Sequence, residues 1–156
     1  MAKEIERKYL VQGDRWKKLA QGVLYRQGYI ATVGKATVRV RVIGDRGYLT
    51  IKGENKGIVR AEFEYPIPVE DAEEMLNTLC DRPLIEKFRY IIPYGNLVWE
   101  VDEFLGDNAG LIIAEVELES EDLVIALPDW IDREVSDPKY FNVNLVKHPY
   151  KLWSDR

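Results

Sequence analysis

Glu4-Ile5-Glu6-Arg7-Lys8 lies near the start of the chain, inside an apolar-flanked run to Val11 that predicts a β-strand. Successive side chains of a strand point to opposite faces, so Glu4, Glu6 and Lys8 share one face. Two neighbouring carboxylates repel each other unless a cation lies between them, and the lysine is placed to meet an anion that such a cation holds. The pattern indicates a metal ion bound beside a phosphate, with a solvated strand face as the plainer alternative.

The same alternation of charged and apolar residues recurs along the chain. Strands are predicted over residues 3–12, 23–32, 36–43, 48–52, 58–67, 84–92, 97–104 and 111–118. Short helices are predicted after Asp14, over 70–80, from Ser120 to Leu127, and from Asp137-Pro138 toward Val146. Each strand has one apolar and one charged face, which favours a mainly β, antiparallel α+β architecture.

The charged faces carry signs in blocks, strand by strand. The acids are Glu4, Glu6, Glu62, Glu64, Glu100, Asp102, Glu115 and Glu117, and the bases are Lys8, Arg39, Arg41, Lys52, Arg60, Lys87 and Arg89. Like-charge neighbours such as Arg39 and Arg41 destabilise a sheet unless an anion lies between them. These faces either meet solvent or line the lumen of a closed barrel, whose apolar outer face the helices would cover. In a lumen, divalent cations and a polyanion would supply the partners that confined charges need.

The composition sets the remaining bounds. The 156 residues are 46% hydrophobic and 31% charged, and we expect one globular domain spanning residues 1–156. A net charge of -5 argues against nucleic acid as a partner. The single cysteine, Cys80, fits a reducing compartment, and no apolar run approaches the ~20 residues of a membrane span, so a cytoplasmic protein without membrane contact is expected. The sequence leaves open whether the protein is a monomer or a homodimer.

The ordered set of motifs resembles the CYTH superfamily, also called the triphosphate tunnel metalloenzymes. The resemblance covers nearly the whole chain. It is carried by Glu4-x-Glu6-x-Lys8, Arg39-x-Arg41, Leu49-Thr50-Ile51-Lys52, Arg60-x-Glu62-x-Glu64, Lys87-x-Arg89, Asp102 and Glu115-x-Glu117. Arg26-Gln27-Gly28-Tyr29 and Tyr140-Phe141-Asn142 are similar to segments of small bacterial members.

The resemblance implies an eight-stranded antiparallel barrel that forms a tunnel, with helices packed outside, and hydrolysis of a triphosphate that depends on Mg²⁺ or Mn²⁺, with two ions expected. Oxygen ligands suit both metals. The implied metal ligands are Glu4, Glu6, Asp102, Glu115 and Glu117, and the implied phosphate-binding residues are Arg39, Arg41, Lys52, Arg60, Lys87 and Arg89. Lys8 and Tyr29 match catalytic positions, and Glu62 and Glu64 are expected to orient the basic side chains.

The family includes several activities on one tunnel. Inorganic tripolyphosphate is the expected substrate, because a compact chain leaves little protein for recognising a base or an RNA end. Adenylate cyclase of one class and hydrolysis of thiamine triphosphate or another organic triphosphate are the alternatives. A polyphosphate-binding module without turnover is an alternative of another class, which the intact acidic set disfavours.

Overall fold

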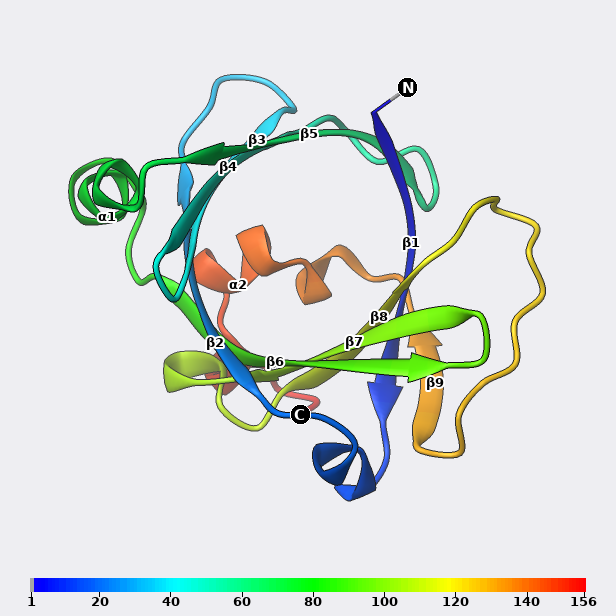
Figure 1. Ribbon diagram of the computed structural model, residues 1–156. Helices are drawn as coiled ribbons and strands as arrows, with labels where there is room; N and C mark the ends of the chain where they lie inside the picture. Colours follow the sequence, from blue (N-terminus) through cyan, green and yellow to red (C-terminus); the bar gives the residue numbers. More distant parts are fainter. Residues whose placement is uncertain (1) are drawn as a thin grey trace.

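The computed structural model describes residues 2–156, and its main element is one strongly curved antiparallel sheet (Figure 1). Its strands are β1 (Lys3–Val11), β2 (Val23–Ile30), β3 (Thr37–Ile43), β4 (Arg46–Lys52), β5 (Val59–Ile67), β6 (Ile85–Tyr94), β7 (Leu97–Phe104), β8 (Ile112–Glu117) and β9 (Ile131–Val135). The helices are α1 (Val69–Thr78) and α2 (Asn142–Lys147), and the 3₁₀ turns are η1 (Arg15–Lys18), η2 (Gly106–Asn108), η3 (Pro138–Tyr140) and η4 (Tyr150–Leu152).

The first eight strands close into a barrel. Their order around the ring is β1-β8-β7-β6-β2-β3-β4-β5, and β5 returns to β1 through the pairs Lys3 with Ala61, Glu4 with Arg60 and Ile5 with Val59. Closure removes the unpaired edges that an open sheet would expose. The predicted eight-stranded antiparallel barrel is thereby confirmed.

Two segments differ from the sequence prediction. The helix expected from Ser120 to Leu127 is wrong: that segment has no helix, and the Arg7 guanidinium takes the carbonyl oxygens of Glu121 at 2.8 Å and Leu123 at 3.4 Å. Val124 is exposed there, while Ile125 packs against the outer core. The ninth strand, β9, was not predicted, and it pairs with the second half of β1 outside the ring.

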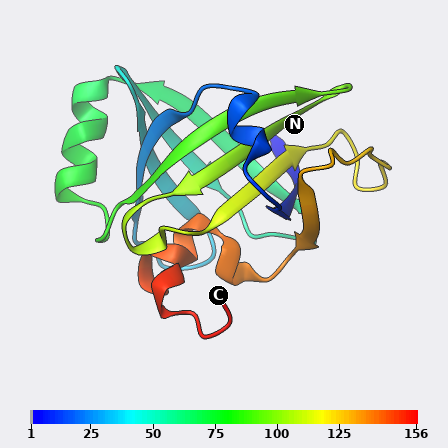
Figure 2. The ribbon, with the colours of Figure 1, turned by 90° about the horizontal axis from the view of Figure 1, so that it is seen from below.

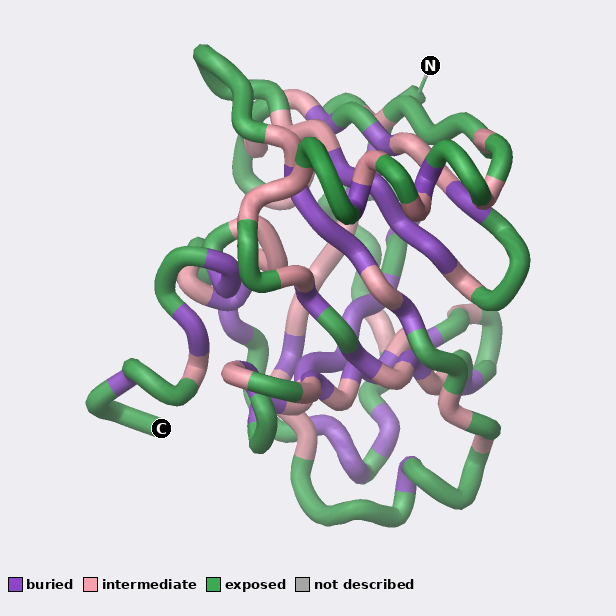
Figure 3. The backbone as a smooth tube through the Cα atoms, turned by 90° about the vertical axis from the view of Figure 1, so that its left-hand side faces the viewer, coloured by how far each residue is buried: buried purple, intermediate pink, exposed green. Residues whose placement is uncertain are grey.

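The outer face of the barrel is apolar and is covered in two places. Helix α1 packs Ala72 and Leu76 against Val40 and Val42 of β3. Around β1, β7 and β8, the outer core includes Trp16 of η1 and Trp130 from the segment before β9. The buried parts of the backbone follow the strands, whereas most of the exposed parts are connecting loops (Figure 3).

The C-terminal segment covers one end of the lumen (Figures 1 and 2). Asp137 caps η3 as expected, because its Oδ1 accepts a hydrogen bond from the Lys139 amide at 2.9 Å. The single helix expected toward Val146 is interrupted by the extended residue Phe141, and α2 begins only at Asn142. Toward this end the inward positions of the strands become apolar, and they pack on the segment as one core. That core contains Tyr29, Ile85, Phe104, Leu111, Ile113, Tyr140, Leu145, Val146 and Trp153.

This packing explains why α2 does not lie on an outer face of the barrel, where helices were expected. Ile85, Phe104 and Ile113 share strand faces with Lys87, Asp102 and Glu115, so each of these strands turns from charged to apolar along one face. The apolar end of the lumen needs a cover, and Leu145 and Val146 of α2 supply it.

No helix among the described residues is long and apolar enough to cross a membrane.

Candidate active site

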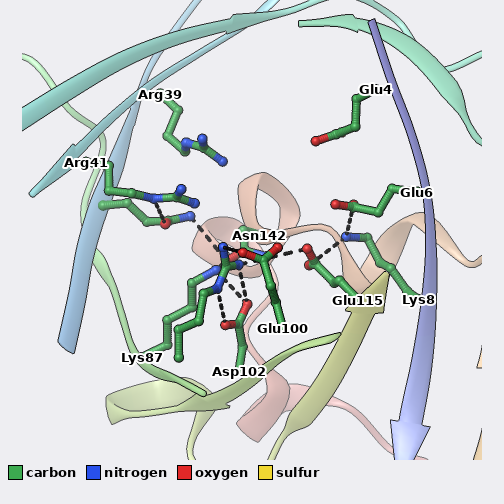
Figure 4. Close-up of polar contacts among 12 residues, drawn as sticks. Glu4, Glu6, Lys8, Arg39, Arg41, Lys87, Glu100, Asp102, Glu115 and Asn142 are labelled. Atoms are coloured by element: carbon green, nitrogen blue, oxygen red, sulfur yellow. Dashed lines mark hydrogen bonds and ion pairs between the residues drawn. The ribbon is translucent and has the colours of Figure 1, made fainter. Parts of the chain in front are cut away.

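Strand order places the two signs of charge on opposite walls of the lumen. The acids of β7, β8 and β1 come from three adjacent strands, and the basic pairs of β6 and β3 flank β2 on the other side. In Figure 4, Arg39 and Arg41 face Glu4 and Glu6 across the lumen. An anion between these walls would meet cations on one side, and a cation beside it would meet carboxylates on the other.

Two connected cavities follow the lumen. An inner cavity of about 40 Å³ is lined by Lys8, Tyr29, Lys87, Phe141 and Asn142, among others. A wider cavity of about 340 Å³ carries most of the predicted acids and, with the inner one, shares Glu6, Arg39, Arg41, Lys52, Arg89 and Glu115. All the predicted site residues line one cavity or both, except Asp102. The predicted set is thus brought together in one lumen.

Lys8 lies between two carboxylates of the acidic wall. Its Nζ donates to Glu6 Oε1 at 2.9 Å and to Glu115 Oε1 at 2.8 Å, with 12% of its side chain exposed. Burial alone would lower the pKa of Lys8, but Glu115 and Glu6 raise it above the usual value, so the ammonium stays charged. Burial alone would raise the pKa of Glu115, but Lys8 and Arg89 hold it well below its usual range.

Lys52 bridges a second pair of carboxylates, those of Glu4 and Glu62, near the start of β1. Its Nζ lies 3.3 Å from both Glu4 oxygens and 3.3 Å from Glu62 Oε2. Arg60 Nε adds a contact to Glu4 Oε1 at 3.5 Å. Glu64 Oε2 lies 3.6 Å from Arg39 Nη2. Glu62 and Glu64 therefore contact basic side chains, as the orienting role predicted for them requires.

Asp102 anchors the basic residues of β6. Its carboxylate accepts from Arg89 Nε at 2.7 Å and Nη2 at 2.9 Å, and Lys87 Nζ lies 2.8 Å from Oδ2, while Asp102 itself has no exposed surface. Burial raises its pKa, but Arg89 and Lys87 outweigh burial and lower it. Lys87 shares this carboxylate with a guanidinium, and burial with the charges of Arg89 and Arg41 lowers its pKa to about 7.

The arginines of β3 lack acidic partners of comparable strength. Arg41 Nε donates to Gln27 Oε1 at 2.9 Å, and burial together with Arg39 and Arg89 lowers the pKa of Arg41 to about 9. Arg39 Nη2 donates to Thr50 Oγ1 at 3.1 Å, and its Nε is buried with no hydrogen-bond partner among residues 2–156. Crowded, desolvated guanidinium groups of this kind are stabilised by an anion such as phosphate.

The acidic wall has a complementary excess of negative charge. Burial and Glu115 raise the pKa of Glu6 to about 7, and burial with Glu4 and Glu100 raises the pKa of Glu117. Among residues 2–156, no three Asp, Glu, His or Cys side chains lie close enough together to hold a metal ion, and Lys8 lies between the carboxylates of Glu6 and Glu115. The candidate ligand atoms are nonetheless all carboxylate oxygens, which suit Mg²⁺ or Mn²⁺. Each of these carboxyl groups has either a raised pKa or a lysine partner.

The remaining predicted residue, Tyr29, lines the inner cavity, where Gln27 Nε2 donates to its hydroxyl at 2.9 Å. Burial raises the pKa of Tyr29 despite the nearby Arg39 and Arg41. Sequence reasoning did not assign roles to Gln27, Thr50, Phe141 or Asn142. Gln27 and Thr50 share strand faces with Tyr29 and Lys52, so strand parity would have placed both in the lumen, but no sequence signal brings Asn142 there.

Comparisons with known proteins agree with this geometry. A family model described as the CYTH domain matches residues 2–150. An inorganic triphosphatase of Acetivibrio thermocellus is 59% identical over 156 residues, covering 99% of this chain and all of the relative. One of Nitrosomonas europaea is 37% identical, covering 88% of this chain and 92% of the relative. A crystal structure of an inorganic triphosphatase aligns with a TM-score of 0.63 at 32% identity, covering 94% of this chain and 95% of that one.

Proposed function

The chain belongs to the CYTH domain family, and from this premise we propose that it hydrolyses inorganic triphosphate with the help of divalent metal ions. The observation that carries the proposal is the division of the lumen into two facing walls, with Arg39 and Arg41 opposite Glu4 and Glu6 (Figure 4). Triphosphate is a linear polyanion that needs cations along its whole length. One wall supplies them directly, and the other supplies the ligands for metal ions.

The metal ligands we propose are the four of the five expected acids that line the lumen, Glu4, Glu6, Glu115 and Glu117. The fifth residue expected from the sequence, Asp102, would reach a cation only by giving up its contacts to Arg89 and Lys87, and we assign it to holding those two bases. Two ions of Mg²⁺ or Mn²⁺ fit the number of carboxylates. When bound, they would neutralise charge on the phosphate oxygens and favour attack by water.

The chain's own residues would hold the substrate. The guanidinium groups of Arg39 and Arg41 offer donors in a planar arrangement that matches the oxygens of a phosphate, while Lys52, Arg60, Lys87 and Arg89 add charge. Lys8 extends from the acidic wall and donates to two proposed metal ligands, Glu6 at 2.9 Å and Glu115 at 2.8 Å. We assign Lys8 to the reacting phosphoryl group, where a fixed ammonium stabilises charge that develops as the bond breaks.

Inorganic triphosphate is favoured over organic triphosphates because the described lumen is lined mainly by charged side chains and is covered at one end by the C-terminal segment. The named activity of both relatives agrees with this choice. The cytoplasmic location expected from the lone Cys80 and the absence of a nucleic-acid partner stay predictions.

The test is release of phosphate from inorganic triphosphate, ATP and thiamine triphosphate, measured side by side with Mg²⁺, Mn²⁺ or EDTA. We expect inorganic triphosphate to give the highest kcat/KM and EDTA to abolish turnover. Preference for ATP with release of pyrophosphate would favour a cyclase, and binding without turnover in any metal would favour a binding module. Glu103→Gln, on the outer face of β7, is a matched control that should behave as the unmodified protein.

A further inference from the structure

Asn142 is a polar residue of the C-terminal segment that enters the lumen. It is the first residue of α2, and it lines the inner cavity with Lys8, Tyr29 and Lys87. Figure 4 shows it beyond the acidic and basic walls, at the covered end of the lumen. The rest of α2 serves as packing, since Leu145 and Val146 are buried in the apolar core at that end.

Two donors fix the orientation of the Asn142 amide. Lys87 Nζ donates to Asn142 Oδ1 at 2.9 Å, and Gln27 Nε2 donates to the same oxygen at 3.2 Å. The Gln27 amide is itself fixed, because its Oε1 accepts from Arg41 Nε at 2.9 Å. Because Arg41 holds the oxygen of Gln27, the Gln27 Nε2 group can only donate, so Asn142 must turn its oxygen toward Gln27 and Lys87 and its NH₂ group away.

The oxygen of Asn142 is then engaged, and its Nδ2 group is the part left to meet the inner cavity that the residue lines. None of the side-chain hydrogen bonds within residues 2–156 uses it, and it is not among the buried nitrogens that lack a partner there. A donor held in this way beside Lys87 and Lys8 is suited to a phosphate oxygen. It also differs from its neighbours in carrying no charge, so its donors are available at any pH.

We propose that Asn142 is a substrate-contacting residue whose Nδ2 donates to an oxygen of the phosphate at the covered end of the lumen, and that Gln27 is the positioning residue that orients it. The proposal rests on the proposed function, because it takes the anion in the lumen to be a triphosphate. It gives the C-terminal segment a direct role in binding in addition to its packing.

Two substitutions of Asn142 distinguish contact from positioning. Asn142→Leu keeps the size but removes both the acceptor for Lys87 and the donors. Asn142→Asp keeps and strengthens the acceptor for Lys87 but replaces the donors with a negative oxygen. If Asn142 donates to the phosphate, Asn142→Asp is the more damaging change, because it sets a carboxylate against the anion. If Asn142 only holds Lys87, Asn142→Asp is tolerated and Asn142→Leu is not.

The experiment compares kcat and KM for inorganic triphosphate in both variants, with Asn144→Leu as control. Asn144 is exposed on the same helix and does not line the inner cavity. We expect Asn142→Leu to lose about 10- to 100-fold in kcat/KM, the range for a hydrogen bond to a charged group, and Asn142→Asp to lose more. Asn144→Leu should stay within about 3-fold. Wild-type activity in Asn142→Asp, or a smaller loss than in Asn142→Leu, overturns the proposal.

Calorimetric titration with inorganic triphosphate in EDTA keeps this test separate from the test of the proposed function. The order of dissociation constants should be unmodified protein, then Asn142→Leu, then Asn142→Asp, with thermal unfolding confirming that each variant folds. If the unmodified protein binds triphosphate but never releases phosphate, the proposed hydrolysis fails while this order still decides the role of Asn142. Equal binding by all three proteins overturns the contact.

Discussion

The Asp102 carboxylate and the Arg89 guanidinium form a bidentate pair inside the barrel wall, with Nε to Oδ1 at 2.7 Å and Nη2 to Oδ2 at 2.9 Å. Both residues are buried, and Lys87 joins them through Oδ2. Under the proposed function, the pair makes Asp102, which resembles a metal ligand in sequence, a support for the proposed phosphate-binding bases. Asp102 lines neither cavity of the lumen, so we expect the substrate not to contact it.

Asp102→Asn should therefore destabilise the protein more than it changes metal affinity. Removing one partner of a buried ion pair costs about 3–5 kcal/mol, which corresponds to a Tm lower by roughly 10 °C. Inorganic phosphate should raise the Tm of the variant more than that of the unmodified protein, because it compensates the unpaired bases. Glu103→Gln, which removes a partly exposed partner of Lys17, should cost under about 1 kcal/mol. Equal Tm values for the two variants would contradict the supporting role of Asp102.

Lys8→Ala should lose mainly kcat. The Lys8 ammonium lies 2.8 Å from Glu115 Oε1, a proposed metal ligand, and we propose that the reacting phosphoryl group binds beside it. An interaction made mainly in the transition state affects kcat, whereas one made equally with bound substrate affects KM. We expect a loss of at least ~100-fold in kcat at saturating Mg²⁺, the lower end for a positioned electrostatic group.

Arg41→Ala is the comparison for Lys8→Ala, with a larger share of its loss in KM. Arg41 lies on the basic wall and contacts Gln27, away from the proposed metal ligands. Steady-state hydrolysis of inorganic triphosphate measures both variants, and circular dichroism checks that they fold. Should Lys8→Ala keep the full kcat and raise only KM, Lys8 is another phosphate-binding residue and its catalytic assignment is wrong.

Glu117→Gln should weaken metal binding with little effect on folding. Burial and the carboxylates of Glu4 and Glu100 raise the pKa of Glu117, so its charge is uncompensated until a cation binds. We expect the Mg²⁺ or Mn²⁺ concentration for half-maximal activity to rise about 10-fold or more, equivalent to one pKa unit of interaction. Glu119→Gln, an exposed residue two positions on, serves as the control. An unchanged metal requirement in Glu117→Gln would remove it from the ligand set.

Metal ions should stabilise the protein more at pH 8 than at pH 5.5. The pKa of Glu6 is about 7 in the folded protein and 4.5 ordinarily, so between these values the folded state holds a proton that the unfolded chain has lost. The contribution of Glu6 to the free energy of unfolding therefore falls as pH rises from about 4.5 to 7. A bound cation offsets that loss, and protons compete with it at low pH.

Thermal unfolding with and without Mn²⁺ at the two pH values measures this effect. In Glu6→Gln, which has no charge to lose, the increase in Tm with Mn²⁺ should become smaller and less dependent on pH. An increase in Tm that is equal at both pH values in the unmodified protein would show that Glu6 does not take part in metal binding.

The alternation of side chains predicted the charged face of each strand, and the resemblance to the CYTH family implied the closed eight-stranded barrel. In β3, Arg39 and Arg41 alternate with Val38, Val40 and Val42, and such a strand can bury its valines only if the arginines share the opposite face. Repeated on strand after strand, this pattern fixed which residues line the lumen. It could not place the segment from Ser120 to Leu127, where contacts of Arg7 with backbone carbonyls replaced the expected helix.

The amino-acid sequence by itself determined the two faces of each strand, because strand periodicity is local and depends only on position along the chain. The order of strands around the ring was decided by the tertiary structure alone, and it is this order that separates acids from bases and buries Asp102 beneath Arg89. The same holds for Asn142, which reaches Lys87 across 55 positions of sequence. Such contacts depend on which surfaces pack together, and no periodicity within a segment records that choice.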